Sequence, residues 1–268
     1  MFCAKVRLAL CLVLTCGAIS LMVPQTATAT TSCKYNFSSG IGNSRLIFCV
    51  TVNGNIAQIE TSPGQWISSG GEGYGICDQN APQNYTDYGV SDTGNWGSPA
   101  LVSHTSSSVT IARSTGDGKW TLTQTITKVP TTSSIKVSMA VKNNQSVSDT
   151  VYLVRFANAY LTTANNNGYE GWFETQNSAF VWTDNNFYTT VNYGLMLQNV
   201  GNPPFGFWQG YAQTVPTGPN ACAFAFNDSG GAYFGGGGFG PAGSIEVAYV
   251  NNIAPGQTLS ANLTYRGF

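Results

Sequence analysis

Carboxylates beside an aromatic ring are the residues of this sequence best suited to acid-base chemistry. Glu170 and Glu174 flank Trp172, and Asp184 follows in the same stretch. A pair of carboxylates beside a sugar ring can supply the acid and the base or nucleophile of glycoside hydrolysis. The competing interpretation is that these are solvated loop charges that keep an aromatic segment soluble. We therefore keep Glu170, Glu174 and Asp184 as candidates, and predict a domain without catalytic residues.

A second group of residues suits binding. Aromatic side chains are frequent between residues 158 and 220, where they are interspersed with Asn, Gln and Gly. Flat rings stack on the apolar faces of sugar rings while amides satisfy hydroxyl groups, and neither contact needs charge. The alternative is that the rings form the core of a large β-domain. The ligand-binding candidates are Tyr169, Trp172, Trp182 and Trp208.

The histidine and cysteines favour structure over catalysis. His104 is the single histidine, so neither a serine nor a thiol nucleophile has a choice of basic partner, and we expect His104 in a surface turn. Cys33, Cys49, Cys77 and Cys222 show no C-x-x-C spacing, which disfavours zinc. Three pairings into two disulfides are open, and we prefer Cys33 with Cys49 and Cys77 with Cys222. No metal and no cofactor is predicted.

The N-terminal residues resemble a secretory signal. Lys5 and Arg7 precede an apolar run, Leu8 to Val23, and Ala27-Thr28-Ala29 is a small-residue cleavage site. A retained membrane anchor would need about 20 apolar residues, and this run is shorter. We therefore expect residues 1–29 to be a signal peptide and the mature chain to begin at Thr30. The predicted location is extracellular or in the cell envelope, where disulfides persist.

Charge is scarce throughout the chain. Charged residues make up 9% of the sequence and the formal net charge is −1. No run of basic residues is available to neutralise phosphates, which argues against nucleic acids and anionic membranes. The surface must consist of neutral polar groups, so the expected partner is a neutral glycan or surface polymer. The oligomeric state is left open.

Strand patterns extend along the whole mature chain, and no stretch keeps a helical period. Arg45 to Val52, the two-residue turn Asn53-Gly54, and Asn55 to Glu60 predict a hairpin. Ser108 to Ser114 and Trp120 to Val129 predict a second one, joined by a glycine-containing turn.

Two further strands are expected after the second hairpin. Ser134 to Val141 and Thr150 to Ala157 should join it in a four-stranded antiparallel meander. Ile245 to Val250 and Thr258 to Arg266 predict a terminal hairpin around Ala254-Pro255-Gly256-Gln257. In residues 158–220 we expect short strands among long loops. The predicted fold is all-β, a single large antiparallel β-sandwich over residues 30–268, without substantial helix.

Several segments together carry a resemblance: Asn53 to Ile56, Gly71 to Cys77, Asp117 to Gln124, Val151 to Arg155, and Ala254 to Gln257. In this order they resemble a group of uncharacterised secreted bacterial proteins with the β-supersandwich layout of sugar mutarotases. The resemblance implies an arrangement of strands and does not imply an activity. Mutarotases use paired histidines with a glutamate at the sugar ring, so with His104 alone their activity is not carried over.

These observations support three functional hypotheses. The first is a secreted, non-catalytic β-domain that binds a neutral glycan or another cell-surface component. The second is a carbohydrate-active enzyme that uses the carboxylates near Trp172. The third is a purely structural envelope or surface protein whose aromatic rings are all core.

Overall fold

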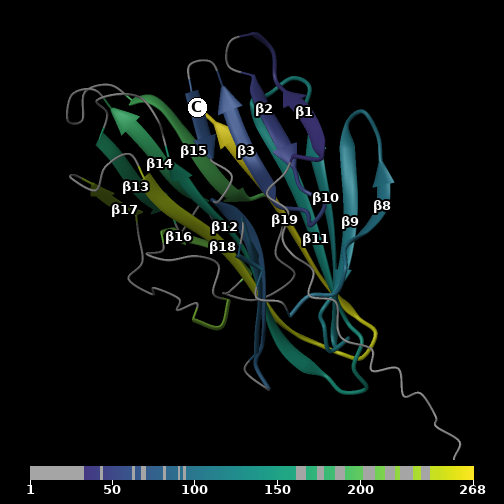
Figure 1. Ribbon diagram of the computed structural model, residues 1–268. Helices are drawn as coiled ribbons and strands as arrows, with labels where there is room; N and C mark the ends of the chain where they lie inside the picture. Colours follow the sequence, from purple (N-terminus) through teal and green to yellow (C-terminus); the bar gives the residue numbers. More distant parts are fainter. Residues whose placement is uncertain are drawn as a thin grey trace, which may run out of the picture.

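The computed structural model is built almost entirely of strands (Figure 1). It describes residues 33–42, 45–61, 64–67, 71–80, 83–89, 91–92, 95–160, 167–173, 178–184, 191–201, 209–214, 221–223, 232–236 and 242–268. The predicted signal peptide, residues 1–29, lies outside these ranges. Helix is confined, among the described residues, to the 3-10 turn Ala221–Ala223 and to Gly42. None of the described residues belongs to a helix that is long and apolar enough to cross a membrane.

The described strands form three antiparallel sheets. The largest has nine strands, in the order β17 (Ala232–Gly236), β13 (Asn167–Phe173), β14 (Ser178–Asp184), β15 (Val191–Asn199), β19 (Thr258–Gly267), β11 (Ser134–Asn143), β10 (Trp120–Lys128), β9 (Ser108–Ser114) and β8 (Ala100–His104). The second has six, in the order β16 (Gln209–Thr214), β18 (Ala242–Ile253), β12 (Asp149–Tyr160), β5 (Glu72–Asp78), β6 (Gln83–Tyr88) and β7 (Ser91–Asp92). The third has four, in the order β1 (Tyr35–Ser39), β2 (Leu46–Val50), β3 (Ile56–Thr61) and β4 (Gly64–Ile67).

Alternating apolar side chains form the core of the sandwich. On β11 the side chains of Ile135, Val137, Met139 and Val141 are buried while the residues between them face outward or are half-buried. Strands β18 and β12 contribute to the same hydrophobic cluster from the six-stranded sheet. Because strand side chains alternate between faces, one face of each sheet can be fully apolar. The prediction of an all-β antiparallel sandwich is confirmed.

The predicted four-stranded meander is wrong in its last strand. Strands β9, β10 and β11 pair in sequence order as expected, but the other neighbour of β11 is β19. Strand β12 lies instead between β18 and β5 in the six-stranded sheet. Both faces of β12 are buried, for example Leu153 on one and Phe156 on the other. Such a strand is stable only in the middle of a sheet covered on both sides.

The predicted terminal hairpin is also wrong in its pairing. The turn forms as expected, with Gly256 at φ 72° and the Gln257 amide donating to the Ala254 carbonyl at 3.0 Å. However, β18 and β19 belong to different sheets. The turn is held at the end of β11, because the backbone N–H of Asn143 donates a 3.0 Å hydrogen bond to the Gln257 carbonyl. The turn therefore carries the chain from one layer of the sandwich to the other.

One other prediction differs from the structure in detail. The first hairpin exists, but β2 and β3 are connected through Thr51–Asn55 and not by a two-residue turn. Gly54 at φ 91° supplies the left-handed backbone that the connection needs. In residues 158–220, where short strands among long loops are expected, the described residues include β13, β14, β15 and β16.

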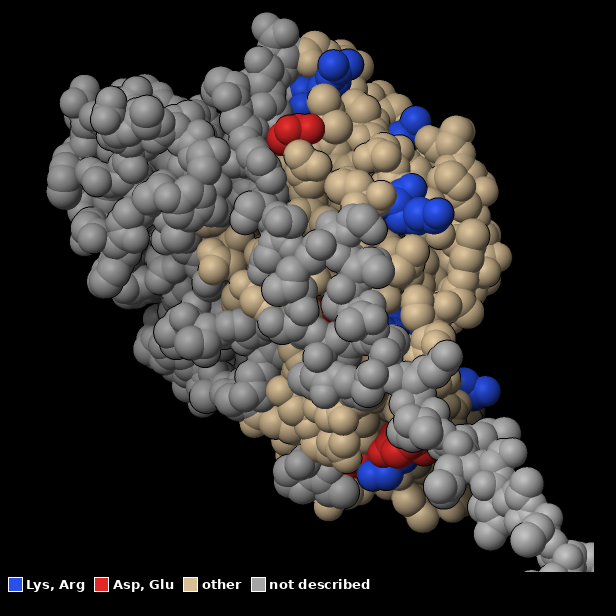
Figure 2. Space-filling model, in the orientation of Figure 1, with Lys and Arg blue, Asp and Glu red and all other residues tan. Residues whose placement is uncertain are grey.

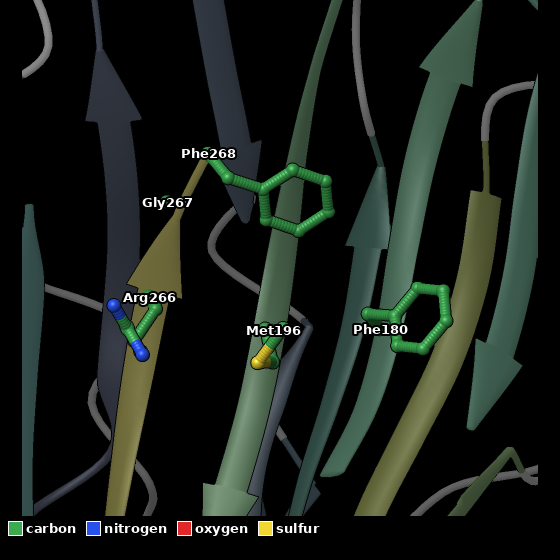
Figure 3. A pocket seen from close by; sticks show the side chains of 5 residues that line it. All are labelled: Phe180, Met196, Arg266, Gly267 and Phe268. Carbon is green, nitrogen blue, oxygen red and sulfur yellow. The ribbon is translucent and has the colours of Figure 1, made fainter. Parts of the chain in front are cut away.

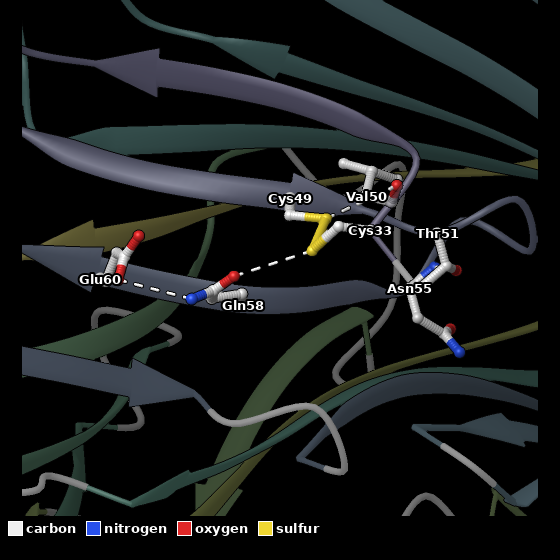
Figure 4. Close-up of a disulfide and its surroundings, with 7 residues drawn as sticks. All are labelled: Cys33, Cys49, Val50, Thr51, Asn55, Gln58 and Glu60. Carbon is white, nitrogen blue, oxygen red and sulfur yellow. Dashed lines mark hydrogen bonds between the residues drawn. A yellow bond between two sulfur atoms is a disulfide. The ribbon is translucent and has the colours of Figure 1, made fainter. Parts of the chain in front are cut away.

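Two disulfides join segments that are distant in sequence. Cys33 and Cys49 link the residues before β1 to β2, with Cα atoms 5.4 Å apart, and Gln58 of β3 lies beside the sulfur of Cys33 (Figure 4). Cys77 and Cys222 link β5 to the 3-10 turn, with Cα atoms 4.9 Å apart. These are the two pairs preferred from the sequence.

Candidate functional site

A pocket of about 330 Å³ opens on the outer face of the nine-stranded sheet. Phe180 of β14, Met196 of β15 and Arg266 of β19 lie side by side in the register of these three strands. Figure 3 shows the three side chains in a row across neighbouring strands, with the ring of Phe268 over β15. The lining is therefore two aromatic rings, a thioether and one guanidinium, with Gly267 at the side.

A glycine on β15 makes room for one of these rings. Gly194 and Phe268 exchange two backbone hydrogen bonds of 2.9 and 3.1 Å. A β-carbon placed on Gly194 would overlap Cζ of Phe268 and would lie 2.7 Å from the carbonyl oxygen of Val181. Because neither contact is compatible with a side chain, the position of the Phe268 ring depends on the glycine.

One of the four predicted ligand-binding residues adjoins this pocket. Trp182 is half-buried, stands two residues from Phe180 on β14, and has its ring centroid 5.3 Å from that of Phe180. Tyr169 is the β13 residue paired with Trp182, and Trp172 is paired with Ala179. The side chains of Tyr169 and Trp172, and the whole of Trp208, lie outside the described residues.

The predicted carboxylates are placed only by their backbones. Glu170 of β13 is paired with Val181, and Asp184 ends β14 opposite Asn167. The side chains of both, and the whole of Glu174, lie outside the described residues. His104 is exposed at the end of β8, with its ring centroid 4.9 Å from that of Tyr35. It therefore lies on a strand and not in the predicted turn.

A buried carboxyl group that sequence reasoning missed lies on the outer face of the six-stranded sheet. Glu246 of β18 is 2% exposed, and its Oε1 atom has no hydrogen-bond partner among the described residues. Burial raises the pKa of this carboxyl to about 8. At neutral pH such a group is mainly the neutral acid, which can donate a hydrogen bond or a proton.

Aromatic and amide groups surround this position. Phe156 of β12 is paired with Glu246, and its ring makes an edge contact with Tyr88 at a centroid distance of 5.1 Å. Asn158 hydrogen-bonds the Tyr88 hydroxyl, while burial raises the pKa of that hydroxyl. In the sequence, Glu246 alternates with Ile245 and Val247, so a solvent-facing carboxylate is the natural expectation.

A third polar cluster lies where β5 ends and β12 begins. The Lys119 ammonium lies 3.2 Å from Oδ2 of Asp78 and 3.7 Å from Oδ2 of Asp117. Asp149 is buried beside Asp78, and desolvation together with the contact between the two carboxyls raises its pKa. Tyr85 donates a 2.6 Å hydrogen bond to Asp117. The cluster ties the β9–β10 turn to the six-stranded sheet.

Two ion pairs lie inside the sandwich. Glu72 pairs with Arg155 and also accepts hydrogen bonds from the Tyr265 hydroxyl at 2.7 Å and the Ile56 amide at 2.5 Å. The remaining guanidinium nitrogens of Arg155 donate to Gln124 at 2.5 Å and to the Gly54 carbonyl at 3.2 Å. Burial raises the pKa of Glu72 even though Arg155 opposes this shift.

The second ion pair joins Asp87 to Arg113. Asp87 also accepts a 2.6 Å hydrogen bond from the Asn55 amide, and Arg113 donates to the Tyr74 hydroxyl at 3.2 Å. Tyr74 in turn donates to the Asn53 carbonyl at 2.9 Å, so the β2–β3 connection lies between the two pairs. All four charged side chains are at most 1% exposed and each is paired with an opposite charge, which indicates a structural network.

The interior network explains the sequence segments that carried the resemblance. Asn53 to Ile56, Gly71 to Cys77, Asp117 to Gln124 and Val151 to Arg155 each contribute a residue or a backbone group to the buried pairs or to the Lys119 cluster. Acidic and basic residues inside otherwise apolar strands are the signal that could have predicted it, since isolated buried charges are too costly to remain unpaired.

Comparisons with known proteins identify the fold class. No protein-family model matches this sequence, and no curated protein matches it. Among solved structures, a galactose mutarotase related enzyme from Lactobacillus acidophilus is similar with a TM-score of 0.51 and 7% identity, over 87% of this chain and 97% of that one. A galactose mutarotase-like protein from Lactobacillus casei also has a TM-score of 0.51 and 7% identity, over 87% of this chain and 100% of that one.

A bacterial glucoamylase complexed with acarbose is similar over a smaller part of its own length. Its TM-score is 0.51 at 9% identity, and the match covers 90% of this chain but 33% of the glucoamylase. At such low identities the similarity shows the fold alone. The chain therefore has a mutarotase-like β-sandwich fold.

Proposed function

We propose that this chain is a non-catalytic carbohydrate-binding domain that acts outside the cell or in the cell envelope. The observation that carries the proposal is the aromatic pocket formed by Phe180, Met196 and Phe268, with Trp182 adjoining it. Aromatic rings on a sheet face give a sugar ring an apolar surface for stacking, and nearby polar groups fix its orientation. The two disulfides support an oxidising location.

The neighbouring strands supply the hydrogen-bonding groups that such a site needs. The outer face of β19 presents Ser260 and Asn262, which are exposed, and Asn262 accepts a 2.7 Å hydrogen bond from Ser138 of β11. Hydroxyl and amide groups of this kind pair with sugar hydroxyls without requiring charge. The fold is compatible with this role, since mutarotase-like and glucoamylase structures share it.

The proposal is tested by glycan-array screening followed by calorimetry on the best ligand. Phe180→Ala and Trp182→Ala should each weaken binding by about 1 to 3 kcal/mol, the value of a lost stacking contact together with its apolar area. Leu101→Ala is the matched control, because Leu101 is 56% exposed on β8 at one edge of the same sheet. If no glycan binds, the purely structural hypothesis is favoured. If Leu101→Ala weakens binding as much as the pocket variants do, the pocket is not the binding site.

A carbohydrate-active enzyme is the second candidate, and Glu246 is the observation that favours it. Its buried carboxyl with a pKa of about 8 could act as a general acid at neutral pH, beside the aromatic and amide side chains of Phe156, Tyr88 and Asn158. Glycan turnover that Glu246→Gln abolishes would establish this candidate. Loss of turnover in Glu170→Gln or Glu174→Gln would instead establish the carboxylates near Trp172.

A further inference from the structure

Charged groups are distributed unevenly over the molecule. Glu72, Asp78, Asp87, Asp149 and Glu246 are all buried. In contrast, Lys136, Lys142 and Arg266 are exposed. Figure 2 shows Lys and Arg side chains spread over the described part of one face, while Asp and Glu reach that surface in few places. Among the residues that the structure describes, most acidic side chains are therefore hidden, while Lys136, Lys142 and Arg266 reach the surface.

The three exposed cations share the outer face of the nine-stranded sheet. Strands β9, β10, β11 and β19 contain no Asp or Glu. Arg266 is paired with Ser134 of β11, and Lys136 and Lys142 follow on the same strand at positions that face the same way. From Ser134 to Lys142 the strand extends about 27 Å, at about 3.4 Å per residue. This length suits a polymer better than a single sugar ring.

Arg266 brings a guanidinium to the aromatic pocket. It forms one side of the pocket beside Met196, as Figure 3 shows. Among the described residues, no carboxylate pairs with Arg266, Lys136 or Lys142. A guanidinium binds carboxylate or sulfate oxygens in a two-pronged geometry that an ammonium cannot reproduce.

We infer that the glycan bound at this face is an acidic polysaccharide, with an anionic group of one sugar ring on Arg266 and the following residues of the polymer along Lys136 and Lys142. This inference rests on the proposed function, because it names the ligand class of the same pocket. The low total charge of the sequence led to the expectation of a neutral partner. The position of the charges changes that expectation.

The experiment compares acidic polymers with neutral polymers of the same backbone. Polygalacturonate and its carboxyl-reduced form test a carboxylate, and dextran sulfate with dextran tests a sulfate. Calorimetry should show at least tenfold tighter binding of one acidic polymer than of its neutral partner. Raising NaCl from 50 to 200 mM should weaken that binding roughly tenfold, as expected for about three neutralised charges.

Variants assign the effect to the residues named. Arg266→Gln should weaken binding of the acidic polymer about tenfold more than it weakens binding of the neutral partner, while Arg266→Lys keeps part of the preference. Lys136→Gln with Lys142→Gln should reduce the salt dependence. Lys34→Gln is the matched control, because Lys34 is exposed but lies outside these strands.

Three negative outcomes are distinguishable. Equal binding of acidic and neutral polymers, with no effect of Arg266→Gln, would overturn the inference and leave the proposed function standing. Absence of binding to these polymers and to every glycan of the array would overturn both. A DNA duplex bound as tightly as the acidic polymer would also overturn the inference, because the face would then be selective for charge and not for sugar.

Discussion

Arg155 carries a charge that is completely removed from solvent. Its guanidinium contacts Glu72, Gln124 and the Gly54 carbonyl, and its ion pair with Glu72 is fully buried. Replacing buried ion pairs with apolar residues can be nearly neutral, but removing one partner leaves an uncompensated charge. The interior pair therefore specifies how β5, β10 and β12 fit together, and its contribution to stability depends on both partners being present.

Arg155→Met should lower the free energy of unfolding by about 3 to 5 kcal/mol, because Glu72 then remains buried without its cation. Urea denaturation followed by fluorescence measures the change. The double variant Arg155→Met with Glu72→Met should recover part of the loss. A decrease below about 1 kcal/mol in the single variant would mean that Glu72 is neutral in the native protein.

Glu246 should make the native protein less stable as pH rises. Its pKa is about 8 in the folded state, against a value of 4.5 for an unperturbed group. Between these two pKa values the native state binds the proton more strongly than the unfolded state does. The contribution of Glu246 to stability is therefore fully present below pH 4.5 and is lost as the pH rises to about 8. Glu246→Gln removes this dependence. Wild type should therefore lose several kcal/mol relative to the variant between about pH 5 and pH 8, as measured by urea denaturation. Parallel pH profiles of the two proteins would contradict the assignment.

At the scale of elements, the disulfides constrain chain segments of very different length. The sequence separation is 16 residues for Cys33 and Cys49 and 145 residues for Cys77 and Cys222. Closing the longer loop removes more entropy from the unfolded chain. Replacing Cys77 and Cys222 by Ala should cost about 2 kcal/mol more unfolding free energy than replacing the other pair. Thermal and urea denaturation of the two double variants give the comparison, and equal losses would refute the chain-entropy explanation.

The alternation of apolar and polar residues predicts where strands lie and which of their faces is buried, but it does not predict which strands pair. The strands β9, β10 and β11 and the buried row from Ile135 to Val141 follow from a period of two. The same pattern could not predict that β12 and β18 leave the sheet of their sequence neighbours, because alternation contains no information on which edge a strand joins. Burial of both faces of β12 depends on segments far away in the chain.

The candidate site was predictable only in part for the same reason. Trp182 could be recognised by its type, but Phe180, Met196 and Arg266 come from three strands whose adjacency no local pattern contains. The burial of Glu246 could not be predicted, because a carboxylate between two apolar residues of a strand usually faces solvent. The disulfide pairs were accessible because the four cysteines that follow residue 29 allow only three pairings into two disulfides.

At the scale of the whole molecule, protection from exchange should follow the position of strands within the sheets. Strand β12 has a partner on each side and both faces buried, while β8 has β9 as its one partner among the described strands and all its residues are exposed. Amide hydrogen exchange in β12 should therefore require global unfolding, and exchange in β8 should occur through local opening. Native-state exchange read by mass spectrometry tests this order. Similar rates in the two strands would indicate that the molecule opens as a single unit.

The place of β19 in the nine-stranded sheet has a consequence for how the chain folds. This strand is the last in sequence and lies between β15 and β11, where Arg266 pairs with both Met196 and Ser134. The strands on both sides of β19 are synthesised before it. Two half-sheets, each with an open hydrogen-bonding edge, must therefore stay apart until β19 pairs with them. Such long-range pairing makes folding slow. Assembly of the nine-stranded sheet therefore waits for β19, and until it pairs the edges of β15 and β11 are open to strands of other chains.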